Sequence, residues 1–242
     1  MIKNFLVSTR PAEKSKSVLE RNGILIRNFP LTRIVSYGHD ITLEKQITGF
    51  SPDSLVFTSE VGVRIFLAEY PHVIRDSSMK MFAIGEKTAM ALERMGYTAI
   101  YPEKKDSAGL AEFILSFPGD IGKVALIRSK NADSLLLDVL NRAGVIAKDF
   151  HIYEVTRAEN AGLIVKVIQK RGFMGIIVTS PMEAQTLFDL IKPYEMKTLP
   201  VYAIGGTTRI KLESLGIGVN PPFGESDFTK LVDKITENLR KK

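Results

Sequence analysis

The stretch FAIGEKTAMALERMGY at residues 82–97 returns later in the chain as YAIGGTTRIKLESLGI at residues 202–217. Both copies read aromatic residue, Ala, Ile, Gly, two variable residues and Thr. A run with apolar residues at helical spacing follows and ends at a Gly, which is typical of a strand that leads into a capped helix. The chain therefore contains this strand–helix unit twice.

The similarity extends on both sides of the two quoted stretches. SLVFTSEVGVRIFL at residues 54–67 pairs with GIIVTSPMEAQTLF at residues 175–188, and each Thr-Ser pair precedes the Ala-Ile-Gly by nearly the same distance. Each copy then closes with Pro, Ser and an amphipathic run, and residues 5–31 resemble residues 124–153 more loosely. A repeat of this length is too long for a solenoid and indicates a duplicated domain.

Short, continuous apolar runs alternate with helical patterns in both copies. Continuous apolar runs are typical of strands that are covered on both faces, and strand–helix alternation implies parallel sheets with right-handed crossovers. We predict two doubly wound α/β domains related by internal duplication. Strands are expected at residues 4–9, 54–59, 80–85, 123–129, 175–180 and 199–205, and helices at residues 15–23, 60–70, 87–96, 133–144, 182–191 and 207–216.

Composition excludes several kinds of site. The 242 residues include no cysteine, so disulfides, thiolate nucleophiles and iron–sulfur clusters are excluded. The three histidines, His39, His72 and His151, have no metal-ligand spacing, although carboxylates could still form a metal site in space. The chain has no complete P-loop and no G-x-G-x-x-G after a strand, so neither ATP nor NAD is supported. We expect no cofactor and no metal.

The formal net charge of +6 has two interpretations, a solvated basic surface or attraction to an anionic partner. Lys and Arg are spread along the chain without interleaved aromatic residues, which favours a small polyanionic ligand over nucleic acid. No apolar run is long enough to span a bilayer, and the first apolar segment is too short for a signal peptide. We therefore expect a cytoplasmic protein that does not bind membranes.

Small polar and basic residues follow the predicted strands. In doubly wound folds ligands bind where strands end and helices begin, and helix N-termini offer free backbone N–H groups to carboxylates or phosphates. Ser and Thr are also ordinary helix N-caps, so each junction alone has a purely structural interpretation. Together they predict an anion-binding cleft between the domains, formed by residues 9–11, 58–59, 85–88, 128–129, 179–181 and 205–208.

Nearly the whole chain resembles the uroporphyrinogen-III synthase family. The motifs that carry the resemblance occur in the family's order and spacing: STRP, FTSEVGV, AIGEKTAMALERMG, VALIRS, LLLDVLNRAG, IYEV, VTSPMEA and AIGGTTRIKLESLG. The chain departs from the family pattern at Glu183 and Arg209, where small residues are usual. Residues 131–133 also replace a more basic turn that contains glycine.

The resemblance implies how the domains are built. One domain would hold residues 1–32 plus 157–242, and the other residues 35–153, with hinges near residues 31–35 and 153–157. The crossings PLTRIV and IYEVTR are rich in β-branched residues, which suits a two-stranded connector.

The resemblance also implies an activity. The enzyme would close hydroxymethylbilane, a linear tetrapyrrole with many carboxylates, to uroporphyrinogen III, with loss of water and inversion of ring D through a spiro intermediate. This is a cyclising lyase reaction of tetrapyrrole biosynthesis (haem, sirohaem or cobalamin) that needs no cofactor. We further expect a monomer that makes transient contact with hydroxymethylbilane synthase.

Tyr153 matches the family's Tyr before the second crossing, and the resemblance makes it the candidate proton donor for the departing hydroxyl. A phenol is protonated at neutral pH and can donate, but Tyr153 could equally be a connector residue that only packs its ring. The expected substrate contacts are hydroxyl-bearing residues, Ser59, Thr88, Ser180, Thr207 and Thr208, and basic residues, Arg10, Lys87 and Arg128.

Two other classes of function remain open. A non-catalytic tetrapyrrole-binding or regulatory protein could use the same scaffold, because a fold does not determine function. An attached regulatory domain would favour that class. A two-lobed solute-binding protein also has two α/β lobes and a hinge, and a signal peptide would favour it.

Overall fold

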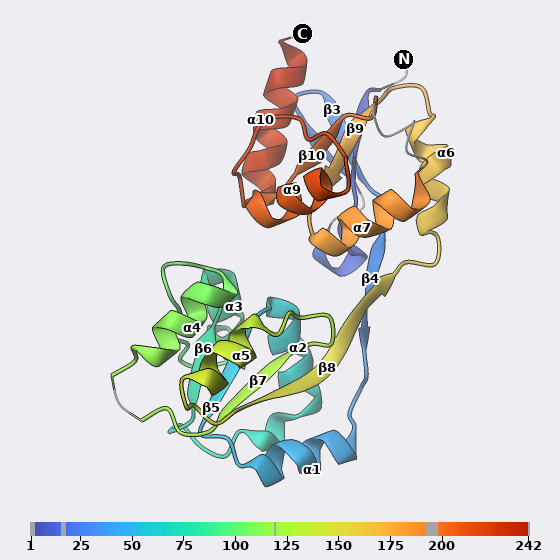
Figure 1. The fold of residues 1–242 in the computed structure, drawn as a ribbon. Coiled ribbons are helices and arrows are strands. Elements are labelled where there is room, and N and C mark those ends of the chain that lie inside the picture. The colour runs from blue at the N-terminus through green and yellow to red at the C-terminus, as the bar shows by residue number, and fades with distance from the viewer. Residues whose placement is uncertain (1–2, 16–17, 119, 192–197, 242) are drawn as a thin grey trace. The chain divides into compact units, whose positions relative to one another are not determined.

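The computed structural model describes residues 3–15, 18–118, 120–191 and 198–241. The chain divides into two compact units. Unit 1 comprises Met1–Ile34 and Thr156–Lys242, and unit 2 comprises Val35–Val155. Each unit contains a five-stranded sheet with helices on both of its faces (Figure 1).

The sheet of unit 1 has the strand order β10-β9-β1-β3-β2. Its strands are β1 (Phe5–Ser8), β2 (Val18–Arg21), β3 (Ile24–Asn28), β9 (Phe173–Val178) and β10 (Val201–Ala203). All neighbouring pairs are parallel except β2 and β3, which are antiparallel. The helices are α6 (Ile164–Ile168), α7 (Pro181–Leu190), α9 (Gly205–Ser214) and α10 (Phe228–Arg240).

The two faces of this sheet bury separate clusters. Val7 packs in one cluster with Leu187 of α7 and Leu212 of α9. Leu6 packs in the other with Leu231 of α10. Adjacent strand residues point to opposite faces, so the run FLVS is buried at every position, as expected of a strand covered on both sides.

The sheet of unit 2 has the strand order β4-β8-β7-β5-β6. Its strands are β4 (Thr32–Ser36), β5 (Ser54–Phe57), β6 (Lys80–Ala83), β7 (Val124–Ser129) and β8 (Ala147–Arg157). The four strands β6, β5, β7 and β8 are parallel. The helices are α1 (Ile41–Phe50), α2 (Glu60–Glu69), α3 (Glu86–Glu93), α4 (Ser107–Leu115) and α5 (Leu135–Arg142).

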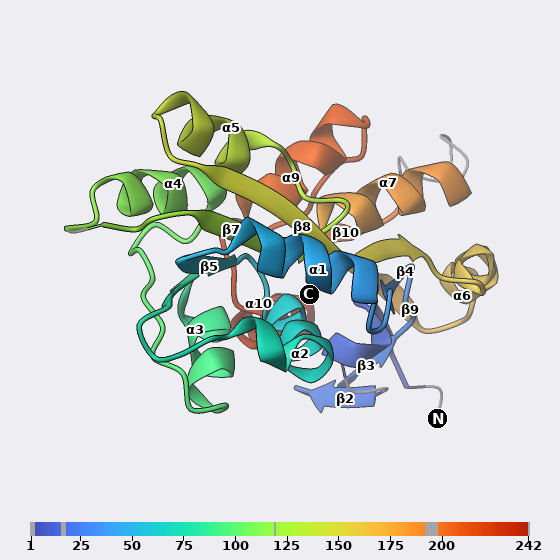
Figure 2. The same cartoon turned by 90° about the horizontal axis from the view of Figure 1, so that it is seen from below.

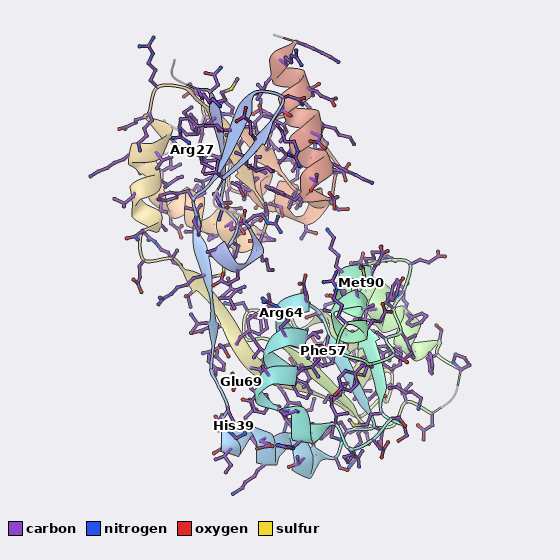
Figure 3. The ribbon with its side chains drawn as sticks, turned by 180° about the vertical axis from the view of Figure 1, so that it is seen from behind. Arg27, His39, Phe57, Arg64, Glu69 and Met90 are labelled. Carbon is purple, nitrogen blue, oxygen red and sulfur yellow. The ribbon has the colours of Figure 1, made fainter. Side chains whose placement is uncertain are left out.

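Helices α4 and α5 cover one face of this sheet, and α1 and α2 the other (Figure 2). On the α2 face the ring of Phe57 meets that of Phe66 edge-on, with centroids 5.4 Å apart. In unit 1 the guanidinium of Arg27 lies 4.5 Å from the ring centroid of Phe5. Figure 3 labels Phe57 and Arg27 on their strands.

The chain passes between the units in β4 and β8, which pair with each other. The backbone N–H of Tyr37 donates to the carbonyl oxygen of Ile152 (3.2 Å), and Nε of Arg33 to Oγ1 of Thr156 (3.4 Å). Residue numbers thus rise along one strand as they fall along the other, so the two crossing segments form an antiparallel ribbon.

The predicted class of fold is confirmed: both copies of the repeat form mostly parallel sheets flanked by helices. The predicted helix at residues 15–23 is wrong. Its residues 16–17 lie outside the described part of the chain, but Val18–Arg21 form β2, antiparallel to β3. Asn22 and Gly23 both have positive φ (51° and 78°), as a two-residue hairpin turn requires, and Asn-Gly is the sequence best suited to it. The Asn-Gly turn therefore decided the local structure, although the apolar spacing is helical.

Among the described residues, no helix is long and apolar enough to cross a membrane.

Candidate functional site

The parallel strands bring the predicted site residues to the carboxyl edge of each sheet. In unit 2 these are Ser59 after β5, Lys87 and Thr88 after β6, Arg128 at the end of β7 and Tyr153 in β8. In unit 1 they are Arg10 after β1, Ser180 after β9, and Thr207 and Thr208 after β10. That the two edges face each other across a cleft stays a prediction.

A β-bulge sets the direction of Tyr153. Arg128 pairs with His151 across the ladder, but Ser129 pairs with Tyr153, so β8 holds one extra residue at Ile152. In a regular strand, Phe150 and Tyr153 would point to opposite faces. Here Phe150 packs on Phe50 of α1, while Tyr153 approaches α2 on the same face. Bulges re-aim side chains in this way.

The hydroxyl of Tyr153 meets Ser59 at the first turn of α2. Their oxygens are 2.8 Å apart, and Oγ of Ser59 also accepts the backbone N–H of Gly62 (2.9 Å) as the helix N-cap. A Cβ on Gly62 would lie 3.2 Å from Oγ of Ser59 and 3.7 Å from Cε1 of Tyr153, so the glycine leaves room for the ring.

Burial decides the protonation of Tyr153, which is 5% exposed. Desolvation raises the pKa of its phenol above the ordinary value of 10.0, and the hydrogen bond with Ser59 lowers it in part. The group is therefore a neutral phenol at physiological pH and keeps a proton that it can donate.

The backbone around Tyr153 is fixed by the turn after β7. The N–H of Lys130 donates to the Tyr153 carbonyl oxygen (2.9 Å), and the N–H of Val155 to Oδ1 of Asn131 (2.6 Å). Ser129 Oγ donates to the same Asn131 oxygen (3.0 Å). Asn131, one of the departures from the family pattern, thus anchors the strand that carries Tyr153.

Arg128 has a role that the sequence did not indicate. Its guanidinium makes two hydrogen bonds to Asp149, from Nε (2.6 Å) and from the terminal nitrogen (2.7 Å), and the residue is 1% exposed. A substrate carboxylate could reach it only by breaking this pair. In this structure the Arg128 guanidinium forms an ion pair that joins β7 to β8, and its contact with substrate stays a prediction.

The turn after β6 combines a buried hydroxyl residue with exposed charges. Thr88 is buried, Lys87 is exposed, and Gly85 precedes α3 as its N-cap. The stem of Lys105 packs against Gly85, and its ammonium pairs with Glu86 (3.2 Å). Sequence reasoning missed Lys105, because nothing near residue 105 marks it as a neighbour of this turn.

In unit 1, Glu183 occupies the position of the repeat that Gly62 has in unit 2. Ser180 caps α7 by accepting the Glu183 N–H (3.2 Å). The Glu183 carboxylate is 1% exposed and accepts hydrogen bonds from Thr9 Oγ1 (2.6 Å), Thr179 N (2.8 Å) and Thr179 Oγ1 (3.0 Å). It therefore joins the ends of β1 and β9 from within.

The remaining predicted contacts of unit 1 differ in exposure. The Arg10 guanidinium lies 4.5 Å from the ring centroid of Phe228, and its carbonyl oxygen accepts from the Asn28 amide (3.0 Å). Thr207 is exposed and Thr208 is buried in the first turns of α9. These groups provide a positive charge, a hydroxyl and a helix N-terminus at one edge.

Other kinds of site have less support. Among the described residues, no group of three or more His, Asp or Glu side chains could hold a metal ion. A cavity lined by Ile74, Met79, Met81 and Tyr97 lies in unit 2, and none of the predicted site residues lines it.

Two α/β units with parallel sheets, paired crossing strands and polar strand-to-helix turns define a class of two-lobed α/β proteins that bind ligands at strand ends. Within that class the family is clear. Residues 13–221 match the family model described as uroporphyrinogen-III synthase HemD, so the chain belongs to the uroporphyrinogen-III synthase family. The resemblance stated from the motifs is thereby confirmed.

Solved structures agree on the fold. A mutant uroporphyrinogen III synthase from Thermus thermophilus superposes with a TM-score of 0.69 at 17% identity, covering 99% of this chain and 100% of that one. The uroporphyrinogen-III synthetase from Helicobacter pylori gives a TM-score of 0.65 at 16% identity, covering 98% and 100%. Comparison with curated proteins gave no match.

Proposed function

We propose that the protein is a uroporphyrinogen-III synthase, a cyclising lyase of tetrapyrrole biosynthesis that acts on hydroxymethylbilane. Family membership over residues 13–221 is the observation that carries this proposal. The two-unit fold shared with synthases from two bacteria supports it.

In the proposed reaction, the terminal hydroxyl of the bilane leaves as water and an azafulvenium cation remains. The substituted carbon of ring D attacks the cation to give a spiro intermediate, which fragments and recloses with ring D inverted. The bilane also closes unaided without inversion, so the protein must mainly impose a conformation, which is catalysis by positioning.

Tyr153 is the proposed proton donor to the leaving hydroxyl. Its phenol is neutral, lies in the cluster of strand-end groups in unit 2, and is held by Ser59 and by the turn at Asn131. A well-positioned general acid contributes about 10²- to 10⁴-fold to a rate. The bilane hydroxyl ionises readily, so the lower end of that range applies here.

The substrate carboxylates are proposed to bind at the strand-end turns. The first turns of α2, α3, α7 and α9 offer backbone N–H groups and the positive end of the helix dipole to anions. The side chains proposed to add hydroxyl or cationic contacts are Thr88, Ser180, Thr207, Thr208, Arg10 and Lys87.

We further propose that units 1 and 2 are the two domains of the enzyme, and that it works as a cytoplasmic monomer without a cofactor. Hydroxymethylbilane synthase would contact it transiently, and neither nucleic acid nor membrane would bind. Light scattering of the purified protein tests the monomer, and exhaustive chelation before assay tests the absence of a metal.

The deciding experiment supplies freshly generated hydroxymethylbilane and measures which uroporphyrinogen isomer accumulates. We expect the type III isomer, against the non-inverted isomer in a control without protein. A tetrapyrrole-binding or regulatory protein would bind the product but leave the isomer ratio at that of the control. A solute-binding protein would also leave the ratio unchanged, and either outcome would refute the synthase proposal.

A further inference from the structure

We propose that Ser59 acts on the reaction through Tyr153 rather than by contacting substrate: its hydroxyl donates a hydrogen bond to the Tyr153 oxygen and holds the charge left there after proton transfer. This inference rests on the proposed function and on Tyr153 as the proton donor. It replaces the role of direct substrate contact that the sequence suggested for Ser59.

The hydrogen bonds around Ser59 favour this direction of donation. A serine hydroxyl has one hydrogen and two acceptor lone pairs. One lone pair accepts the Gly62 N–H (2.9 Å), and the only side-chain oxygen at hydrogen-bond distance from Oγ among the described residues is the Tyr153 hydroxyl at 2.8 Å. If Ser59 donates to Tyr153, the phenol proton is available for another acceptor, which is the arrangement that a general acid needs.

The proton balance of the reaction then closes on this pair. The Tyr153 proton moves to the terminal hydroxyl oxygen of the bilane, the C–O bond breaks, and its electron pair departs with the water. The phenolate oxygen is left beside Ser59. The last ring closure releases a proton from the ring D carbon that gains the new bond, and that proton restores the phenol.

Burial makes a nearby donor necessary. The Tyr153 side chain is almost fully buried against the first turn of α2, and a charged oxygen without a donor is costly in such a place. Ser59 is the N-cap of the ten-residue helix α2, so the positive end of the helix dipole lies on the same side. The Ser59 hydroxyl and the helix dipole together lower the free energy of the phenolate that forms when Tyr153 gives up its proton.

A double-mutant cycle in single-turnover assays tests the inference. We expect Ser59→Ala to slow type III formation about tenfold, as for loss of a hydrogen bond to a charged oxygen. In the Tyr153→Phe background the same substitution should change the rate by less than about twofold, because its effect passes through the phenol. Equal, multiplying effects in both backgrounds would show direct action on substrate and overturn the inference.

A second readout does not depend on activity. Ultraviolet titration of tyrosine ionisation, with Tyr153→Phe used to assign the signal, should show that Ser59→Ala raises the pKa of Tyr153, since Ser59 lowers it in the native protein. An unchanged titration would also overturn the inference. Ser59→Gly should repeat the shift while keeping most of the N-cap stability, because glycine is tolerated at this position.

Asp106→Ala is the matched control for the loss of an N-cap. Asp106 caps α4 in the same unit by accepting the N–H of Gly109, the third residue of its helix, as Ser59 does for Gly62. This variant should lose cap stability but keep the isomer ratio, the rate and the tyrosine titration. If native protein made no type III isomer, the proposed function would fail, whereas the titration would still decide whether Ser59 and Tyr153 are coupled.

Discussion

Corresponding strands have the same order in the two sheets, since β10-β9-β1-β3-β2 matches β6-β5-β7-β8-β4, and both units have the Thr-Ser turn. The residues packed against that turn differ between the units. Ser59 and Ser180 cap their helices by accepting the N–H of the third helical residue. In unit 2 this residue is Gly62, and the Tyr153 ring lies beside it. In unit 1 it is Glu183, whose carboxylate joins two strand ends. One turn therefore holds a hydrogen-bonded pair of hydroxyls, and the other holds an internal carboxylate.

Arg10 in unit 1 and Arg128 in unit 2 also occupy similar positions but have different partners. Arg10 follows β1 and Arg128 lies near the end of β7, so both are at the carboxyl edge of their sheets. Arg128 is buried and paired with the partly buried carboxylate of Asp149, whereas Arg10 stacks on the ring of Phe228 and keeps partial exposure. The two basic residues thus differ in the partner that holds the side chain, and substrate binding by either one stays a prediction.

The largest expected effect is a loss of unfolding free energy when the carboxylate of Asp149 in unit 2 is removed. Asp149→Ala leaves the buried Arg128 charge without its partner, which costs about 3–5 kcal/mol of unfolding free energy. Denaturant unfolding measures the loss, and hydrogen exchange should locate it in β7 and β8. Arg10→Ala removes a partly exposed side chain that stacks on Phe228, and it should cost less than Asp149→Ala. Equal losses for the two variants would remove the structural distinction between Arg128 and Arg10.

Tyr153→Phe should have the next largest effect and slow type III formation by about 10²-fold in single-turnover assays. Because the pKa of Tyr153 is raised, this phenol stays protonated as pH rises to 10, and its contribution to the rate is lost only at higher pH. The ring remains, so unfolding free energy should fall by only about 1 kcal/mol for the lost hydrogen bond.

Tyr202→Phe is the matched control for that substitution. Tyr202 in β10 of unit 1 is also 5% exposed, and burial also raises its pKa. Its replacement should leave the rate unchanged. A full rate for Tyr153→Phe would mean that the proton comes from elsewhere, and Tyr153 would then be a connector residue.

The sequence predicted the six strands that are continuous apolar runs, such as FLVS and VALI, because buried parallel strands have this pattern. It did not predict β3 or the first part of β8, whose residues alternate between more and less buried positions. It also located the strand-end turns, since Thr-Ser and Ile-Gly directly precede helical patterns. It failed at β2, where a helical spacing outweighed an Asn-Gly turn that could have been recognised. Local patterns thus predicted most local structure.

The partners of the site residues could not be predicted in this way. Ser59 and Tyr153 are 94 positions apart, and Thr9 and Glu183 are 174 apart. Their contacts depend on the strand order and on the bulge at Ile152, which places Tyr153 on the α2 face. Asp149 carries no local sign that it pairs with Arg128. Chemistry that depends on through-space pairs needs the fold.

Glu183→Ala tests the internal carboxylate of unit 1 and should have a smaller effect. It removes the acceptor of the Thr179 N–H and hydroxyl and leaves the Thr9 hydroxyl only the Ile177 carbonyl oxygen (3.2 Å), at a cost of about 1–3 kcal/mol of unfolding free energy. Hydrogen exchange should rise at the ends of β1 and β9. Glu183→Gln keeps one carbonyl oxygen and should cost less than the Ala variant. If both variants unfold like native protein, the carboxylate does not hold the strand ends together.

Gly62→Ala should have the smallest effect and tests the comparison most directly. The added methyl would lie 3.2 Å from Ser59 Oγ, 3.5 Å from the Ile127 carbonyl oxygen and 3.7 Å from the Tyr153 ring. Backbone atoms of β7 yield little, so the Ser59 side chain must turn, at about 0.5–1.5 kcal/mol, or roughly two- to tenfold in rate. Alanine also favours the helix by about 0.5–1 kcal/mol, so unfolding free energy should change little while type III formation slows.

Gly49→Ala in α1 is the matched control, because a Cβ there meets no atom within 4 Å. It should gain the helix stability and keep the full rate. Gly62→Glu places in unit 2 the residue found in unit 1. It should displace the Tyr153 ring from its buried position and lower the pKa of Tyr153 toward the ordinary value, because burial is what raises it. A Gly62→Ala variant with native rate and native titration would show that the glycine does not serve Tyr153, and the contrast between the two turns would then be one of packing alone.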